Sequence, residues 1–307
     1  MKQSLKVLTI GNSFTDSLSV FWQQVVESAG CELHFERANH GGCELHRHWE
    51  YISNEERDRV YRMYQNYTAK MREILAREPW DVVTIQQASH FSCRAETMQP
   101  FAGYIYDYVK KHAPQAEVII QQTWAYRADD PRICPGGVWE ISEWFSESCR
   151  KRGITVQPGV YHIDQTGMYD ALTDAYRKLA RELNCRIIPT GYAVQLARKS
   201  QKDPFPNYDP ELMHTLRWPD LPPQASEFVG NIWWAKNAET GEMELRRDTI
   251  HLNARGQYLQ ACVWFAMLYG RPASDVTFVP DMIGNSDAAF LREIAQKAVD
   301  EFEQEKC

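Results

Sequence analysis

The sequence lacks long apolar runs, paired cysteines and an excess of basic residues, and each absence excludes a class of protein. No apolar run of about 18 residues occurs. No apolar segment follows the first few residues either, so we expect a soluble, cytoplasmic protein without a signal peptide. The eight cysteines form no C-x-x-C pair, which favours reduced thiols over disulfides or a zinc cage. A net charge of -7 argues against binding to nucleic acid or to a membrane surface.

The stretch from residue 6 to residue 16, KVLTIGNSFTD, is typical of a strand, a tight turn and the start of a helix. Val7, Leu8 and Ile10 form a short apolar run without helical spacing, as in a strand covered on both faces. Glycine and asparagine then tolerate positive φ, so the chain can turn sharply and present Ser13 at the helix start. Open α/β sheets bind ligands at this end of their strands. Taken alone, Ser13 is better explained as a helix N-cap, because serine is a preferred cap residue.

A second stretch, RDTIHLNARGQY at residues 247–258, favours a catalytic role for Ser13. Asp248 and His251 lie three residues apart, directly before a helix expected from Asn253. One loop could therefore carry an imidazole and the carboxylate that orients it. Together with Ser13 they would form a triad in the chain order Ser, Asp, His.

Alternation of apolar runs with amphipathic segments predicts a parallel sheet with helical crossovers. We expect a single domain over residues 1–307, with an insertion at about 202–246 that contains six prolines and overhangs the site. The expected strands are residues 7–10, 32–38, 81–86, 117–121 and 186–189. The expected helices are residues 17–29, 55–77, 100–112, 138–151, 168–183, 253–269 and 286–303.

Five blocks of sequence together resemble the SGNH (GDSL-like) hydrolase superfamily. They are Gly11 to Phe14, Gly41-Gly42, the Asp248-x-x-His251 motif, and the pair Gln86 to Ser89 with Gln122 to Tyr126. The last pair looks like a poorly characterised branch of esterases. The resemblance implies a three-layer α/β/α sandwich with a central five-stranded parallel sheet. It also implies a serine esterase acting on carboxylic esters of short acyl groups such as acetyl, often on carbohydrates, without a metal or cofactor.

The same resemblance implies roles for individual residues. Ser13 would be the nucleophile, His251 the general base, and Asp248 the group that orients the imidazole. The oxyanion donors would be the Ser13 N–H, Gly42 after the second strand and, where the superfamily has an asparagine, Gln87 or His90 in its place. The sequence also has Asn12 where the superfamily has an aspartate.

Aromatic residues could supply a sugar-binding surface, since the C–H faces of a pyranose are apolar. Trp124, Tyr126 and Trp233 are the candidates for substrate binding, although tryptophan is as often a core residue. Another feature, His46 and His48 near Cys43, has too few ligands at a metal-binding spacing for zinc. We expect these histidines on a solvated helix face.

Two other classes of function fit parts of the sequence. A first strand followed by Thr9 to Ser13 also resembles the phosphate loop of a flavodoxin-like FMN carrier. That alternative leaves Asp248 and His251 unexplained. A catalytically silent carbohydrate-binding protein is the other alternative, and it predicts no turnover of an activated acetyl ester.

Overall fold

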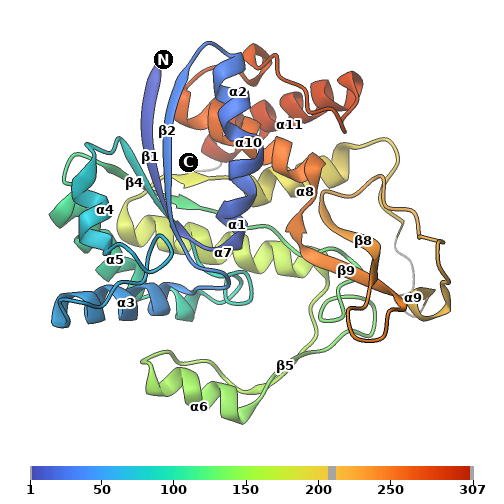
Figure 1. Cartoon of the computed structure of the whole chain (residues 1–307), viewed down its shortest axis with the longest axis horizontal. Coiled ribbons are helices and arrows are strands. Elements are labelled where there is room, and N and C mark those ends of the chain that lie inside the picture. The colour runs from blue at the N-terminus through green and yellow to red at the C-terminus, as the bar shows by residue number, and fades with distance from the viewer. Residues whose placement is uncertain (1, 207–211, 305–307) are drawn as a thin grey trace.

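A parallel sheet of five strands forms the centre of the molecule (Figure 1). The computed structural model describes residues 2–206 and 212–304. The strand order is β2-β1-β3-β4-β7, and every neighbouring pair is parallel. These strands are β1 (Ser4–Gly11), β2 (Glu32–Asn39), β3 (Val82–Ile85), β4 (Glu117–Gln121) and β7 (Ile187–Ile188).

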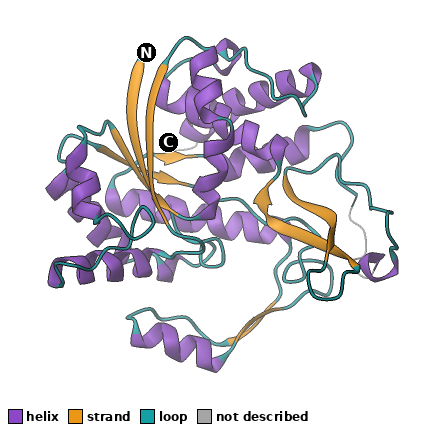
Figure 2. Cartoon of the chain, viewed as in Figure 1, coloured by secondary structure: helices purple, strands orange, loops and turns teal. Residues whose placement is uncertain are grey.

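Helices cover both faces of this sheet (Figures 1 and 2). The connection from β1 to β2 runs one way along the sheet and the later crossovers run the other way. Because such crossovers are right-handed, α2 lies on one face, with α8, α10 and α11, and α3, α4, α5 and α7 lie on the other. The helices are α1 (Ser13–Asp16), α2 (Trp22–Ser28), α3 (Leu45–Arg57), α4 (Met71–Arg77), α5 (Phe101–His112), α6 (Glu143–Lys151), α7 (Gln165–Leu183), α8 (Thr190–Ser200), α9 (Leu212–Thr215), α10 (Ala254–Tyr269) and α11 (Asn285–Gln304), with 3-10 turns η1 (Ser17–Val20), η2 (Ala95–Thr97) and η3 (Ala273–Asp275).

The predicted three-layer α/β/α fold with five parallel strands is confirmed. Burial explains why the sequence pattern was informative. All four residues of β3 are buried, as expected of a central strand covered on both faces. Among the described residues, no helix combines the length and the apolar character needed to cross a bilayer.

The predicted polar helix at 55–77 is wrong. The chain forms α3, which ends at Arg57, and α4, which begins at Met71. Between them Gln65, Asn66 and Tyr67 have φ angles of 49, 58 and 64°. Three successive residues in the left-handed region cannot belong to a right-handed helix.

Two segments extend away from the sheet (Figure 1). One begins in the predicted insertion and continues past residue 246; it forms α9 and an antiparallel hairpin of β8 (Val229–Lys236) and β9 (Met243–Leu252). Residues 207–211 of the insertion lie outside the described residues. The other extension contains the helix expected over 138–151, which forms as α6 but begins only at Glu143. The residues before it form β5 (Trp139–Ile141), which pairs with β6 (Gly159–Tyr161) after the helix.

Candidate active site

Ser13 lies where β1 gives way to α1, at the carboxyl end of the sheet. Asn12 is the N-cap: its side-chain oxygen accepts the Phe14 N–H at 3.1 Å, and its carbonyl accepts the Thr15 N–H at 2.9 Å. The first N–H groups of a helix have no partner within the helix. Ser13 therefore sits at the helix start with its own N–H outside the helical hydrogen bonds, while Asn12 takes the role of cap.

The structure brings Ser13, His251 and Asp248 into one hydrogen-bonded chain. His251 Nε2 lies 2.8 Å from Ser13 Oγ, and His251 Nδ1 lies 2.7 Å from Asp248 Oδ2. Asp248 and His251 belong to the last part of β9, not to the loop that we expected. Segments 238 residues apart in the sequence thus meet at one point.

Hydrogen bonds to Asp248 fix the proton positions in this chain. Its Oδ1 accepts the N–H groups of Ile250 at 2.8 Å and His251 at 3.0 Å. Burial opposes ionisation, but the bonds from the His251 side chain and the two N–H groups outweigh it and lower the pKa of Asp248 to about 2. An ionised carboxylate makes Nδ1 the donor, so the neutral imidazole accepts the Ser13 hydroxyl proton through Nε2.

Buried amides hold the turn that carries Ser13. Asn12 donates through Nδ2 to the Cys43 carbonyl at 3.0 Å, and Gln86 Nε2 donates to Asn12 Oδ1. Gln121 Nε2 donates to the Phe14 carbonyl at 3.3 Å. The two glutamines come from the ends of β3 and β4, so the sheet itself fixes α1.

Gly42 lies beside Ser13, whereas Gln87 does not. Gly42 lines the same cavity as Ser13, with a φ of +62°. Gln87 is fully buried, and its amide donates to the carbonyl and hydroxyl oxygens of Thr97 at 3.1 and 3.2 Å. The prediction that Gln87 faces the oxyanion is therefore wrong, because both of its N–H groups are used elsewhere. The alternative, His90, lines the cavity.

The cavity at Ser13 is small, with a volume of about 230 Å³. Its lining comes from the ends of β1 and β3, the Gly42 loop, the segment after β4, and β9. The lining residues are Asn12, Ser13, Phe14, Gly42, Ala88, Ser89, His90, Tyr126, Arg132, Ile250 and His251.

The three aromatic candidates occupy different positions. Tyr126 lines the cavity and its hydroxyl bonds to Ser89 Oγ at 2.9 Å. Trp124 is fully buried, stacks on Phe14 at 4.2 Å between ring centroids, and so cannot contact a substrate as we expected. Trp233 lies on β8, is 43% exposed, and is not part of the cavity lining.

Trp124 instead supports the site from behind. Its indole N–H donates to the Ile250 carbonyl at 2.8 Å, next to His251, while its ring packs on Phe14, next to Ser13. One buried side chain thereby links the two segments that must meet.

Arg132 also lines the cavity, and no motif in the sequence predicted it. It lies in the irregular segment after β4, where no periodicity indicates which side chains point inward. Arg132 is recognised as a site residue only in the folded protein, where it lines the same cavity as Ser13.

The two histidines expected on a solvated helix face are buried. His48 Nε2 bonds to the Gly11 carbonyl at 3.0 Å, and its Nδ1 to the Tyr64 hydroxyl at 3.1 Å. Burial lowers the pKa of His48 to about 3, so it is a neutral support for the end of β1. Within the described ranges, no group of three or more His, Cys, Asp or Glu residues could hold a metal ion.

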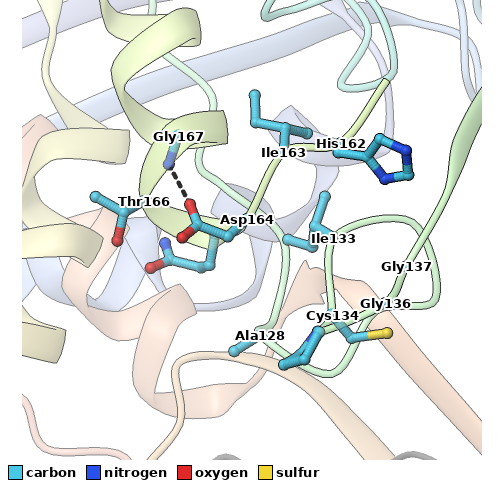
Figure 3. A pocket seen from close by; sticks show the side chains of 12 residues that line it. Ala128, Ile133, Cys134, Gly136, Gly137, His162, Ile163, Asp164, Thr166 and Gly167 are labelled. Atoms are coloured by element: carbon cyan, nitrogen blue, oxygen red, sulfur yellow. Dashed lines mark hydrogen bonds between the residues drawn. The ribbon is translucent and has the colours of Figure 1, made fainter. Parts of the chain in front are cut away.

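A larger cavity of about 780 Å³ lies elsewhere, at the start of α7 (Figure 3). It contains none of the predicted site residues. Its carboxylate, Asp164, accepts the Gly167 N–H at 2.7 Å and so caps its own helix. Cys134 and His162 also line it. These contacts do not indicate a catalytic role for the described residues of this cavity.

Comparisons with known proteins bear on the fold. Residues 6–132 match the family described as Domain of unknown function (DUF4886). The crystal structure of a DUF4886 family protein from Bacteroides uniformis aligns with a TM-score of 0.66 and 21% identity, over 96% of this chain and 95% of that one. The two proteins share a fold.

Other solved structures align less closely. A member of the lipolytic protein G-D-S-L family from Veillonella parvula has a TM-score of 0.41 and 12% identity, over 86% of this chain and 98% of that one. Phospholipase A1 from Streptomyces albidoflavus has a TM-score of 0.38 and 11% identity, over 82% and 94%. No curated protein matches the sequence.

Proposed function

We propose that this protein is a serine hydrolase that cleaves carboxylic esters of short acyl groups, acetyl among them, carried on an alcohol such as a carbohydrate. One observation carries the proposal: Ser13, His251 and Asp248 are joined by hydrogen bonds of 2.8 and 2.7 Å. A serine hydroxyl is a weak nucleophile by itself, and this arrangement supplies both the base and the group that orients it. The cavity of about 230 Å³ supports the short acyl group.

In the first half of the proposed reaction, Ser13 Oγ bonds to the ester carbonyl carbon while its proton passes to His251 Nε2. The carbonyl oxygen becomes an oxyanion. When this intermediate collapses, the bond from carbon to the alcohol oxygen breaks, and the alcohol leaves with the proton from His251. Asp248 stays ionised and stabilises the imidazolium while it exists.

In the second half, water replaces the alcohol. It gives a proton to His251 and bonds to the acyl carbon. Collapse then breaks the bond to Ser13 Oγ, which recovers the proton, and the carboxylic acid leaves. The N–H groups of Ser13 and Gly42 are the proposed oxyanion donors, each worth about 3 kcal/mol of barrier. Ser89 and His90 line the same cavity, and Gln87 does not.

Hydrolysis of 4-nitrophenyl acetate by three variants tests this proposal. Ser13→Ala and His251→Ala should each lower kcat by about 10⁵-fold or more, because the nucleophile or the base is gone. Asp248→Asn should lower it by about 10⁴-fold and leave a remnant, because the imidazole then has the wrong tautomer. Trp144→Ala, which removes an exposed side chain on α6 outside the cavity lining, is the control and should stay within about twofold of wild type on this small ester. Full activity in Ser13→Ala would contradict the proposal.

A further inference from the structure

Three basic side chains line the cavity, and no carboxylate does. His90, Arg132 and His251 are among the described lining residues, which include neither Asp nor Glu. Each basic group has a carboxylate behind it, outside the lining. The pairs are Asp248 with His251 at 2.7 Å, Glu44 with His90 at 3.1 Å, and Asp130 with Arg132 at 2.7 Å. Of these three groups, the Arg132 guanidinium is permanently charged, so the cavity presents a fixed positive charge and no lining carboxylate to whatever enters it.

Arg132 has no role in the ester chemistry itself. Its Nε donates to Asp130 Oδ1 at 2.8 Å and its Nη2 to Oδ2 at 2.7 Å. This side-on pairing leaves the N–H groups of Nη1 outside the ion pair. The guanidinium carbon also lies 4.2 Å from the centre of the Tyr126 ring, another lining residue. Arg132 is thus held in one orientation while 35% of its side chain stays exposed.

The carboxylate behind Arg132 is tied to the strand that carries the proposed triad. Asp130 is 1% exposed, and it accepts the Thr249 hydroxyl at 2.6 Å. Thr249 follows Asp248 on β9. The position of the guanidinium relative to His251 is therefore set by buried contacts, as expected of a preorganised binding group.

Given the ester hydrolysis proposed above, we infer that the substrate carries a carboxylate or another small anion on a part that does not react, and that Arg132 binds this anion. Neutralising the guanidinium would leave the cavity with two histidines as its basic groups. A hydrogen bond between charged groups contributes about 1.5 to 3 kcal/mol, which corresponds to a preference of about tenfold or more.

Matched esters that differ only in charge test this inference. One pair places the anion on the alcohol (4-acetoxybenzoate against 4-acetoxybenzamide), and the other on the acyl group (mono-4-nitrophenyl succinate against the corresponding succinamate). For at least one pair, kcat/KM of wild type should favour the anionic ester by about tenfold or more. In Arg132→Gln that ratio should fall to about one, and Arg132→Lys should retain part of it. Arg150→Gln, which removes an exposed arginine on α6, should leave the ratio unchanged.

A second measurement separates this inference from the proposed function. Binding of 4-hydroxybenzoate and of succinate is measured by calorimetry with wild type and Arg132→Gln, and does not require turnover. Hydrolysis of the neutral esters without any anion preference, and without Arg132-dependent binding, overturns the inference but leaves ester hydrolysis standing. Absence of all hydrolysis, with anion binding that is lost in Arg132→Gln, overturns the proposed function and supports the anion site. If Arg132 only holds its loop in place, Arg132→Gln lowers kcat/KM equally for the anionic and the neutral ester of a pair, and the inference fails.

Discussion

Asn12 shows how one buried amide organises the residues around Ser13. Its oxygen accepts hydrogen bonds from Phe14 and Gln86, and its nitrogen donates to the carbonyl of Cys43, next to Gly42. An ionised aspartate could accept the first two bonds but has no hydrogen for the third. The asparagine therefore joins the Ser13 turn to the Gly42 loop, the two segments from which the proposed oxyanion donors come.

Glu44 should give the stability of the protein a specific pH dependence. Its side chain is 7% exposed and contacts His90 at 3.1 Å and Arg47 at 2.6 Å. Burial opposes ionisation, but these two partners outweigh it and lower the pKa of Glu44 from 4.5 to about 2. A lowered pKa stabilises the fold at pH values above 4.5, and this stabilisation disappears as pH falls towards 2. Its full size is about 3 kcal/mol.

Urea unfolding of Glu44→Gln at a series of pH values measures this contribution. At pH 6 the variant should have a free energy of unfolding lower than wild type by up to about 3 kcal/mol, and the difference should shrink below pH of about 4.5. Glu239→Gln removes the same charge from an exposed side chain and should match wild type throughout. A difference that is constant with pH would show that Glu44 acts through packing instead of charge.

Some residues of the site could be identified from the sequence and others could not. Ser13, Gly42, Asp248 and His251 were identifiable because each stands at a strand end or in a short motif. Arg132 was not, because an irregular segment has no period that relates sequence position to direction. Gln87 was misplaced because a glutamine after a strand can face either the cavity or the interior, and its partner Thr97 could not be foreseen.

At the level of elements, the β8–β9 hairpin positions two of the three proposed catalytic groups. Its register shifts between Val229 and Asn231, around Gly230, which has a φ of +80°. A Cβ on Gly230 would lie 2.1 Å from the Asp248 carbonyl oxygen. Only glycine allows the two strands to approach this closely, and the approach sets the position of Asp248.

Gly230→Ala should therefore impair both stability and activity. Positive φ costs alanine about 1 to 2 kcal/mol, and the clash adds about 1 to 3 kcal/mol. Gly241→Ala is a matched control in the same hairpin, with a φ of +73° but no atom closer than 3.8 Å to the added carbon. We expect Gly241→Ala to lower the free energy of unfolding only by the about 1 to 2 kcal/mol that positive φ costs, and to keep the wild-type kcat. Thermal unfolding and ester turnover measure both effects, and equal losses in the two variants would argue against a positioning role for Gly230.

The same hairpin shows where the sequence was uninformative about elements. Asp248 and His251 were expected in a loop, because they directly precede the helix predicted from Asn253. Both residues lie on β9, which within the described residues pairs with β8 and not with the central sheet. Few side chains of β9 are buried, so no apolar pattern identifies it as a strand in the sequence. The central strands were predicted well for the opposite reason, since burial on both faces produces short apolar runs.

At the scale of the whole molecule, the proposed site exists only when both ends of the chain are folded. Ser13 comes from the first crossover and His251 from the strand before α10, and Trp124 packs against the neighbours of both. The reactivity of Ser13 should therefore depend on the native fold, because in an unfolded chain no base lies near the hydroxyl.

Labelling with a fluorophosphonate probe, followed by mass spectrometry, tests the central claim most directly. Native protein should be modified at Ser13, since the probe reacts with a serine only when a base and oxyanion donors activate it. Ser13→Ala, His251→Ala and wild type unfolded in urea should remain unlabelled. Absence of label on Ser13 in the native protein, or equal labelling of the native and unfolded chains, would contradict the account.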